Sequence, residues 1–382
     1  MPQTQTRSPS RAGIFRAGLL AAGCLLAVSC KAAEAPEPAA EADLGCGPQV
    51  CAEGAALRDA YAGPVETWPA VETTNDTPFE EMSPLVRPVP TDGTAPLEQL
   101  GKALFFDPIL SASGQIACAS CHHPDLAFTD GIRASVGHDR QQGRRNAPTL
   151  LDKADQPVFM WDGAAMSLEH QALMPISNPI EMAESQATLV GTMNADPDYV
   201  ARFSEITGHD TIAMTDITAA LAAYERTLTR RTKFDVFLEG DRERLTDQEL
   251  FGLHLFRTKS RCMTCHSGPR LTDDEFHNIG LTYYGRKYED LGRYALTEAP
   301  DEVGEFKTPS LRHVRRTGPY MHNGLFPSLR GIVNLYNAGG ARPRPRPGME
   351  DDPLFPETSE LLPELNLTSD ERDALVAYLE TL

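Results

Sequence analysis

The sequence predicts an all-α fold in which two helical domains with long loops follow a disordered N-terminal tether. One sequence unit occurs twice: Gly101-Lys-Ala-Leu-Phe105 precedes Cys118-Ala-Ser-Cys-His122, and Gly252-Leu-His-Leu-Phe256 precedes Cys262-Met-Thr-Cys-His266. The first cysteines of the two copies lie 144 residues apart (262 minus 118). The 382 residues therefore give each copy a domain's worth of chain.

Capping boxes and helical periodicity predict where helices form. Thr246-Asp-Gln-Glu249 opens a helix that runs to about Phe256, and Thr368-Ser-Asp-Glu371 opens the last helix of the chain. Apolar residues at helical spacing mark another helix over 217–228. Few segments alternate with the period of a strand, and Pro- and Gly-rich connections such as 339–356 indicate long loops.

The first thirty residues predict an export signal. Three arginines precede the apolar stretch 17–28, which is too short to anchor the chain across a bilayer. Two alternatives stay open for its processing: cleavage of a plain signal peptide near Ala33, or a lipoprotein signal with lipid attached to Cys30. Both place the mature chain in the periplasm, either free or tethered to a membrane.

Residues 31–85 are rich in Ala, Glu, Pro and Thr without a sustained apolar period, which predicts a flexible tether. Cys46 and Cys51 lie within it, and an oxidising compartment favours a local disulfide between them. The predicted organisation is a signal peptide over 1–30, a tether over 31–85, an N-terminal domain over 86–234 and a C-terminal domain over 235–382.

The composition argues against nucleic acid as a partner. Lys and Arg total 35 against 54 Asp and Glu, so the formal net charge is -19, and no basic run offers a stripe for phosphates. An acidic surface attracts cationic partners instead, such as a small basic electron-donor protein.

The two Cys-x-x-Cys-His motifs predict two covalently attached c-type haems. The two thiols of such a motif add to the vinyl groups of haem, and the histidine binds the iron. A disulfide or half of a zinc site is the alternative for a single motif, but two copies behind an export signal favour haem. The attachment residues are Cys118, Cys121 and His122 in the first copy and Cys262, Cys265 and His266 in the second.

Seven further runs carry a resemblance to a known family. They are Leu104-Phe-Phe-Asp-Pro108, Phe128-Thr-Asp-Gly131, Arg145-Asn-Ala-Pro-Thr149, Trp161-Asp-Gly163, Asn178-Pro-Ile-Glu-Met182, Lys307-Thr-Pro-Ser-Leu-Arg312 and Pro319-Tyr-Met-His322. From about residue 96 onward the chain resembles the bacterial diheme cytochrome c peroxidase and MauG family. The resemblance implies two cytochrome-c-like domains, reduction of hydrogen peroxide to water, electrons from a small cytochrome c or blue-copper protein, and a homodimer.

The resemblance also assigns roles around the N-terminal haem. That haem is the one that reacts with peroxide, with His122 as its proximal ligand. Glu181 and Gln171 match distal-pocket residues, of which Glu181 would move the proton. His138 matches a loop histidine that binds the iron in the resting enzyme until the other haem is reduced, which implies reductive activation.

Tyr336 is the residue that distinguishes two branches of the family. The C-terminal haem, with His266 as proximal ligand, takes Met as second ligand in the peroxidases and Tyr in the MauG branch, and Tyr336 matches that position. A phenolate ligand lowers the reduction potential of iron, whereas Met raises it. If Tyr336 were a core aromatic only, Met321 or His322 would be the substitute ligand.

Three further assignments follow from the resemblance. Trp161 matches the tryptophan that relays electrons between the haems, and Asn146, Thr317 and Pro319 match the residues that hold a calcium ion there. Two alternatives to peroxide reduction stay open: a MauG-like oxidase that modifies a partner protein, and a diheme electron carrier without catalysis. Tyr336 favours the first of these, while His138 and the presence of only two Trp oppose it.

Overall fold

The computed structural model describes residues 46–87 and 95–382. Within these ranges the regular structure is helical apart from one small antiparallel sheet, which confirms the predicted all-α class. The α-helices are α1 (Pro48–Tyr61), α2 (Pro96–Phe106), α3 (Cys118–Cys121), α4 (Leu168–Ser177), α5 (Gln186–Ala195), α6 (Pro197–Thr207), α7 (Met214–Arg226), α8 (Lys233–Leu238), α9 (Asp247–Arg257), α10 (Tyr294–Thr297), α11 (Leu329–Asn337) and α12 (Ser369–Leu379). Strands β1 (Phe276–His277) and β2 (Phe306–Lys307) pair with each other.

Short 3-10 helices punctuate the connections between these elements. They span Val65–Thr67, Thr74–Asp76, Pro108–Leu110, Pro124–Leu126, His138–Arg140, Cys262–Thr264, Pro300–Glu302 and Val314–Arg316. The connections are long, as predicted, and they carry most of the residues that build the site described below.

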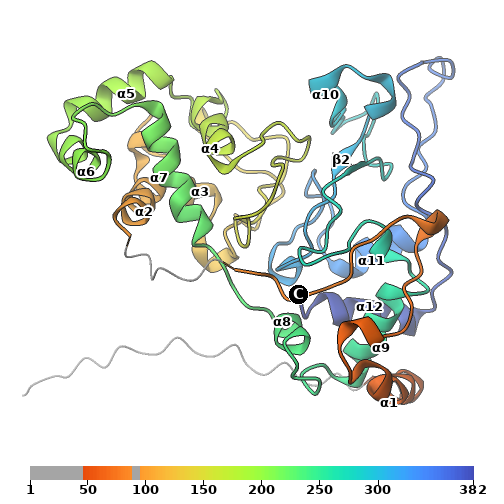
Figure 1. Ribbon diagram of the computed structural model, residues 1–382. Helices are drawn as coiled ribbons and strands as arrows, with labels where there is room; N and C mark the ends of the chain where they lie inside the picture. Colours follow the sequence, from red (N-terminus) through yellow and green to blue (C-terminus); the bar gives the residue numbers. More distant parts are fainter. Residues whose placement is uncertain (1–45, 88–94) are drawn as a thin grey trace, which may run out of the picture. The chain divides into compact units, whose positions relative to one another are not determined.

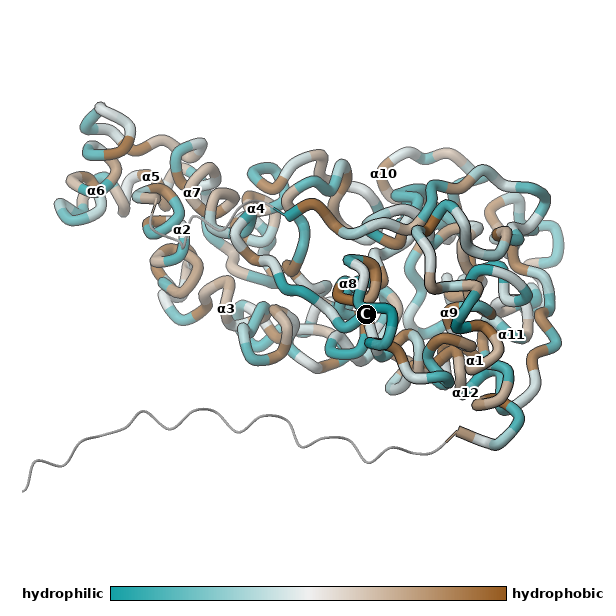
Figure 2. The backbone as a smooth tube through the Cα atoms, turned by 60° about the horizontal axis from the view of Figure 1, so that its bottom comes forward, coloured by the Kyte–Doolittle hydropathy of each residue, from teal (hydrophilic) through white to brown (hydrophobic). Residues whose placement is uncertain are grey.

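Buried apolar side chains form two large clusters, each centred on one pair of helices. The first contains Leu104 of α2 and Leu221 of α7, and the second contains Leu253 of α9 and Leu375 of α12 (Figure 1). Brown and teal residues mix along these helices in Figure 2, as expected for helices with one buried face. The capping boxes predicted at Thr246 and Thr368 are both present.

The glycine of the repeated unit lets each helix pair cross closely. A Cβ atom on Gly101 of α2 would lie 1.8 Å from the carbonyl oxygen of Ala220 on α7, and one on Gly252 of α9 would lie 2.0 Å from that of Ala374 on α12. No side chain fits in either place. The close crossing therefore explains why glycine recurs at the same position of both copies.

Gly252→Ala is expected to destabilise the holoprotein by about 1–3 kcal/mol, because the added methyl group forces α9 and α12 apart. Gly191→Ala is the matched control, since a Cβ on Gly191 of α5 has no atom within 4 Å. Thermal unfolding followed by circular dichroism measures both. A melting temperature of Gly252→Ala equal to that of the unaltered protein would contradict the close crossing.

The predicted flexible tether is wrong for residues 46–85. Helix α1 packs on α9 and α12, and a Cβ on Gly54 would lie 2.0 Å from the backbone oxygen of Asp247. Tyr61 and Trp68 are 1% and 6% exposed and belong to the cluster around α9. The sparse apolar residues of this segment each enter a core that other parts of the chain supply, so no sustained apolar period is needed.

The predicted disulfide between Cys46 and Cys51 is confirmed, with 5.6 Å between the Cα atoms. The export signal over 1–30, Cys30 and the tether residues 31–45 lie outside the described residues. No helix in the described part of the chain has the length and apolar character needed to cross a bilayer. The predicted domain boundary between residues 234 and 235 falls within α8 and stays a prediction.

Candidate functional site

The first Cys-x-x-Cys-His motif forms the single helical turn α3, followed by His122. The Nδ1 atom of His122 lies 2.9 Å from the carbonyl oxygen of Phe128, and this bond assigns the proton to Nδ1. Nε2 is then the atom free to bind iron. Burial lowers the pKa of His122 and thereby favours the neutral imidazole that a metal ion requires.

The second motif repeats this arrangement. Nδ1 of His266 lies 3.2 Å from the carbonyl oxygen of Leu271, and burial lowers the pKa of His266 as well. Phe128 and Leu271 occupy equivalent positions of the repeat, and both have left-handed backbone conformations, with φ of 57° and 54°. The tail that follows each motif therefore repeats because its carbonyl group orients the iron-binding histidine.

Glu181 lies close to the first motif. Burial raises the pKa of the Cys121 thiol, and the charges of Asp130 and Glu181 raise it further against a hydrogen bond with Ser135. The side chain of Glu181 accepts a hydrogen bond of 2.7 Å from Nδ2 of Asn178. Burial raises the pKa of Glu181 itself, as expected for a carboxyl group that must hold or release a proton away from bulk water.

The loop that carries His138 packs directly on the backbone next to Glu181. The backbone N–H of His138 donates to the carbonyl oxygen of Glu181 over 2.8 Å, and a Cβ on Gly137 would lie 2.2 Å from the oxygen of Ile180. Nδ1 of His138 is buried and has no hydrogen-bond partner among the described residues. The structure thus brings the predicted gating histidine and the predicted proton-transfer residue together.

Gln171 lies on α4, which ends shortly before Glu181. Ser167 caps this helix, and Nε2 of Gln171 lies 4.0 Å from the sulfur of Met160. The carbonyl oxygen of Pro175 accepts a hydrogen bond from the backbone N–H of Met182, which ties the end of α4 to the segment that carries Glu181. The predicted distal residues are therefore held by one continuous piece of backbone.

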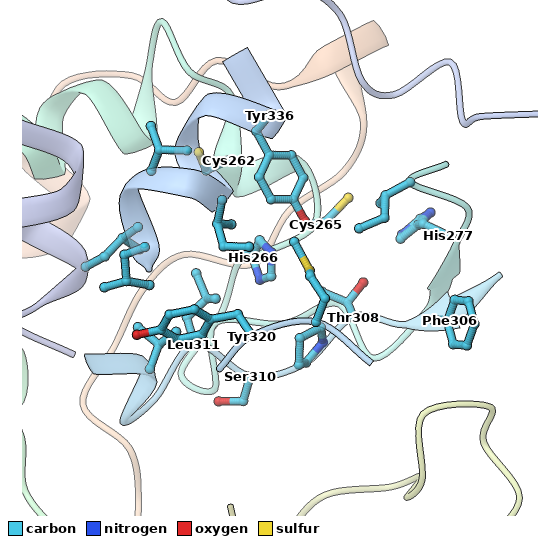
Figure 3. A pocket seen from close by; sticks show the side chains of 18 of the residues that line it. Cys262, Cys265, His266, His277, Phe306, Thr308, Ser310, Leu311, Tyr320 and Tyr336 are labelled. Carbon is cyan, nitrogen blue, oxygen red and sulfur yellow. The ribbon is translucent and has the colours of Figure 1, made fainter. Parts of the chain in front are cut away.

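The second motif lines a cavity (Figure 3). Apolar side chains such as Phe306, Leu311 and Val333 form much of its surface. No Asp or Glu is among the described residues that line it, although the chain contains 54 acidic residues. The permanently or ordinarily cationic residues that line it are Lys153, Arg261, Lys307 and Arg312.

This lining fits haem c. The macrocycle of haem is apolar and would pack against the apolar surface. Its vinyl groups would bond to Cys262 and Cys265, and Nε2 of His266 would bind its iron. Its two propionates are anions, and buried anions require cations nearby. A cavity with cations and without carboxylates meets that requirement.

Tyr336, on α11, points into the same cavity. Its hydroxyl is directed toward Cys265 (Figure 3). Burial raises the pKa of Tyr336 far above its ordinary value, so a phenolate there requires a metal ion. Met321 and His322 also line the cavity, so all three predicted candidates for the second ligand meet there.

His322 is held by two aromatic neighbours. Its ring stacks on Phe306 with 3.6 Å between the ring centroids and meets Trp161 edge-on at 6.3 Å. Its Nε2 has no hydrogen-bond partner in the described chain, and burial lowers the pKa of His322 to about 4. Neutral His322 therefore connects Trp161 to the cavity of the second motif.

The predicted relay and calcium residues also meet at this cavity. Trp161, Asn146, Thr317 and Pro319 all line it. Nε1 of Trp161 donates to the backbone oxygen of Asn146 over 2.9 Å, and Nδ2 of Asn146 donates to the oxygen of Ile132. The side-chain oxygen of Asn146 is thereby left for another partner, in line with an oxygen ligand of calcium.

Several polar residues of the site were missed by the sequence analysis. Asp273 and His277 lie beside Cys265, and the reactive atoms of the three residues are within 4.8 Å of one another. Burial lowers the pKa of His277, whereas the hydrogen bond of 2.8 Å to the carboxylate of Asp273 raises it. The repeated Thr-Asp at 129–130 and 272–273 could have identified Asp273, whereas nothing in the sequence marks Lys153 or Lys307 as lining a cavity.

Two Cys-x-x-Cys-His motifs, each with its histidine oriented through Nδ1, define a c-type cytochrome with two haems. The sequence model of the family described as "Di-haem cytochrome c peroxidase" matches residues 95–243. The methylamine utilization protein MauG of Methylorubrum extorquens is 41% identical over 289 residues, 74% of this chain and 77% of the relative. The chain belongs to the di-haem cytochrome c peroxidase family, and it is an oxidoreductase with haem cofactors.

Two further comparisons agree. Cytochrome c551 peroxidase of Nitrosomonas europaea is 40% identical over 245 residues, 64% of this chain and 73% of the relative. The crystal structure of a MauG-like protein associated with microbial copper homeostasis covers 81% of this chain and 95% of its own, with a TM-score of 0.68 and 31% identity. The family thus includes both peroxidases and MauG proteins at similar identity to this chain.

Proposed function

We propose that the protein reduces hydrogen peroxide to water with two electrons that a small redox protein delivers singly. The observation that carries this function is the half-buried carboxyl group of Glu181, whose charge acts on Cys121 of the first haem-attachment motif and whose backbone bonds to that of His138. An electron carrier requires neither residue. The overall reaction consumes one peroxide, two electrons and two protons and yields two waters.

Different residues of the chain have different roles in peroxide reduction. When bound, the N-terminal haem supplies the iron that takes up peroxide and the C-terminal haem supplies an electron store. Glu181 accepts the proton of the incoming peroxide and returns it to the leaving oxygen, which is the role its raised pKa suits. Gln171 and Pro175 shape the space around Glu181, and Trp161 conducts electrons between the two motifs.

We further infer that the two buried clusters are two cytochrome-c-like domains joined at Trp161. A calcium ion at the joint would be held by oxygens of Asn146, Thr317 and Pro319, which line one cavity. The oxygens of these three residues are uncharged. The charge of the calcium ion would therefore have to be balanced by an anionic group nearby.

The location and partners follow from the sequence. We place the mature chain in the periplasm, with Cys30 as a site of lipid attachment if the lipoprotein signal is used. The net charge of -19 suits a cationic donor, such as a basic cytochrome c or blue-copper protein. The homodimer is proposed on the family resemblance alone.

A second function is favoured by one specific observation. Tyr336 points into the cavity of the second motif, where a phenolate ligand would lower the reduction potential of the iron. That ligand suits a MauG-like oxidase of a partner protein. The buried, unpartnered Nδ1 of His138 favours the gated peroxidase instead, because a histidine ligand keeps the resting site closed.

His138→Gly is expected to turn over peroxide in the all-ferric state, whereas the unaltered protein requires prior reduction of one haem. His138 would hold the iron of the N-terminal haem in the resting enzyme, so removal of its imidazole would leave that iron free for peroxide. Electron-spin-resonance spectra of oxidised and half-reduced samples, followed by addition of peroxide and a reduced carrier, measure this difference. His209→Gly, which removes a half-exposed imidazole far along the sequence, is the control.

Two results would contradict gating by His138. One is full activity of the unaltered protein in the all-ferric state. The other is a long-lived change in its visible spectrum when peroxide is added without prior reduction, which would favour the MauG-like function and make Tyr336 the deciding residue.

A further inference from the structure

We propose that Lys153 binds a propionate of the haem attached at Cys262 and Cys265, and thereby raises the reduction potential of that haem. The inference rests on haem attachment at the second motif and does not depend on peroxide reduction. Lys153 comes from the segment between the first motif and Trp161, so this contact would join the two parts of the chain that carry the haems.

The position of Lys153 is fixed by its neighbour in the sequence. Both carboxylate oxygens of Asp152 are used: Nε of Arg87 lies 3.1 Å from one, and Nε2 of His313 lies 2.7 Å from the other. The backbone N–H of Asp152 donates to the oxygen of Leu228 over 2.8 Å. The contacts of Asp152 therefore fix the position of the backbone at this point of the chain. The side chain of the next residue, Lys153, lines the cavity.

Lys153 has no carboxylate of its own. No ion pair or side-chain hydrogen bond of Lys153 is found within residues 46–87 and 95–382, and Asp152 is already paired with Arg87 and His313. Of the other interior cations, Nζ of Lys307 lies 2.7 Å from Asp274, and Arg312 pairs with Asp235. Arg261, the fourth cation of the lining, is exposed to solvent, so Lys153 is the partly buried cation of this cavity that has no ion-pair partner among the described residues.

The surroundings make that unpaired cation costly. Burial, and then the charge of Lys307, lower the pKa of Lys153 to about 8, although the carboxylates of Asp152 and Asp274 act in the opposite direction. A buried charge without a partner destabilises a protein, and two like charges do so further. An anion between them removes both penalties.

A haem propionate is the anion that the cavity specifies. The cavity is largely apolar, contains two haem-attachment cysteines and has no carboxylate among its described lining residues. A small inorganic anion could pair with the cation, but it would not cover the apolar surface of the cavity. A cation near the haem stabilises the ferrous form, which carries one positive charge fewer, and so raises the reduction potential.

Lys153→Met tests the proposal in the two-haem holoprotein. Both midpoint potentials are recorded by spectroelectrochemical titration at fixed pH, salt and calcium. At the potential where one haem of the unaltered protein is half reduced, its ferrous-to-ferric ratio is expected to fall roughly tenfold in Lys153→Met, a shift of about 59 mV to lower potential. The other haem is expected to keep its midpoint.

Three further variants make the result decisive. Lys153→Arg keeps the charge and is expected to restore the potential, and Lys153→Gln replaces Lys153→Met if the latter does not fold. Lys102→Met removes an exposed charge from α2 and is expected to move neither midpoint. Equal midpoints in Lys153→Met and Lys102→Met, or an equal shift in Lys153→Arg and Lys153→Met, would overturn the proposal. Because no peroxide is present, such a failure is distinct from a failure of peroxide reduction.

Discussion

Glu181→Gln is expected to lower kcat/KM for hydrogen peroxide by roughly 10²–10⁴-fold while the visible spectra of both haems stay unchanged. Glutamine has the size of glutamate and can accept the hydrogen bond from Nδ2 of Asn178, so the local structure is retained. It cannot accept the proton of peroxide. Steady-state turnover with a reduced carrier measures the loss.

The pH dependence of the unaltered protein provides a second readout of Glu181. Burial raises its pKa, so the carboxylate is protonated at a higher pH than an ordinary glutamate, which titrates near 4.3. Because the base form is the active one, kcat/KM is expected to fall as the pH drops through this raised value. Glu205→Gln, an exposed site on α6, is expected to change neither the rate nor the profile.

An unchanged rate in Glu181→Gln would contradict the proton-transfer role and favour an electron carrier. A changed haem spectrum would have another meaning, because it would show that Glu181 acts on the haem environment rather than on peroxide. Both outcomes are separable from unfolding, since the absorbance of the two haems reports their retention.

Asp235→Asn is expected to lower the free energy of unfolding by about 3–5 kcal/mol, because it removes the charge that pairs the buried Arg312 and the partly buried Arg87. Asp235 is fully buried, pairs with Arg312, and lies 2.8 Å from Nη2 of Arg87. It also accepts a hydrogen bond from the backbone N–H of Thr232 at the start of α8. Arg312, whose side chain is 2% exposed, would be left as a buried charge without its partner.

Guanidinium unfolding of the holoprotein at several pH values measures this effect. Burial raises the pKa of Asp235, but Arg312 and Arg87 outweigh it and hold the pKa below its ordinary value. The carboxylate therefore stabilises the fold fully above the unfolded-state value near 3.9, and this stabilisation is lost as the pH falls through the lower folded-state value. The difference between Asp235→Asn and the unaltered protein should accordingly shrink in acid.

Asp125→Asn is the matched control for this substitution, because the Asp125 side chain is 91% exposed. It is expected to leave the unfolding midpoint within about 0.5 kcal/mol. A similarly small effect of Asp235→Asn at neutral pH would show that the network of Arg87, Asp235 and Arg312 does not stabilise the fold.

The helical class was predictable because its signals are local. The capping box at Thr246 and the repeated Cys-x-x-Cys-His motif lie within a few residues of the structure that they determine. Helix α1 was not predictable in the same way, since it buries only Val50, Gly54 and Tyr61. Its contacts are with α9, almost two hundred residues later, and a local apolar period does not report them.

The residues of the site also differ in whether local sequence or long-range contacts determine their positions. The haem-attachment residues follow from the spacing of the two motifs. The roles of Glu181 and His138 come from the resemblance and stay predictions, although the backbones of these two residues bond to each other. The charge of the cavity was not predictable, because Lys153 and Lys307 are 154 residues apart (307 minus 153) and meet only in the folded chain. The choice of second ligand for the C-terminal haem depends on the same long-range packing.

The electron stoichiometry of peroxide consumption tests the proposed function most directly. Purified holoprotein, half-reduced beforehand, is mixed with a reduced single-haem cytochrome c and a known amount of hydrogen peroxide, and both reactants are followed. The expected result is two molecules of carrier oxidised for each peroxide consumed, with no oxygen released. Oxidation of the carrier that is independent of peroxide, or a protein that leaves peroxide unconsumed, would contradict peroxide reduction as the function of this chain.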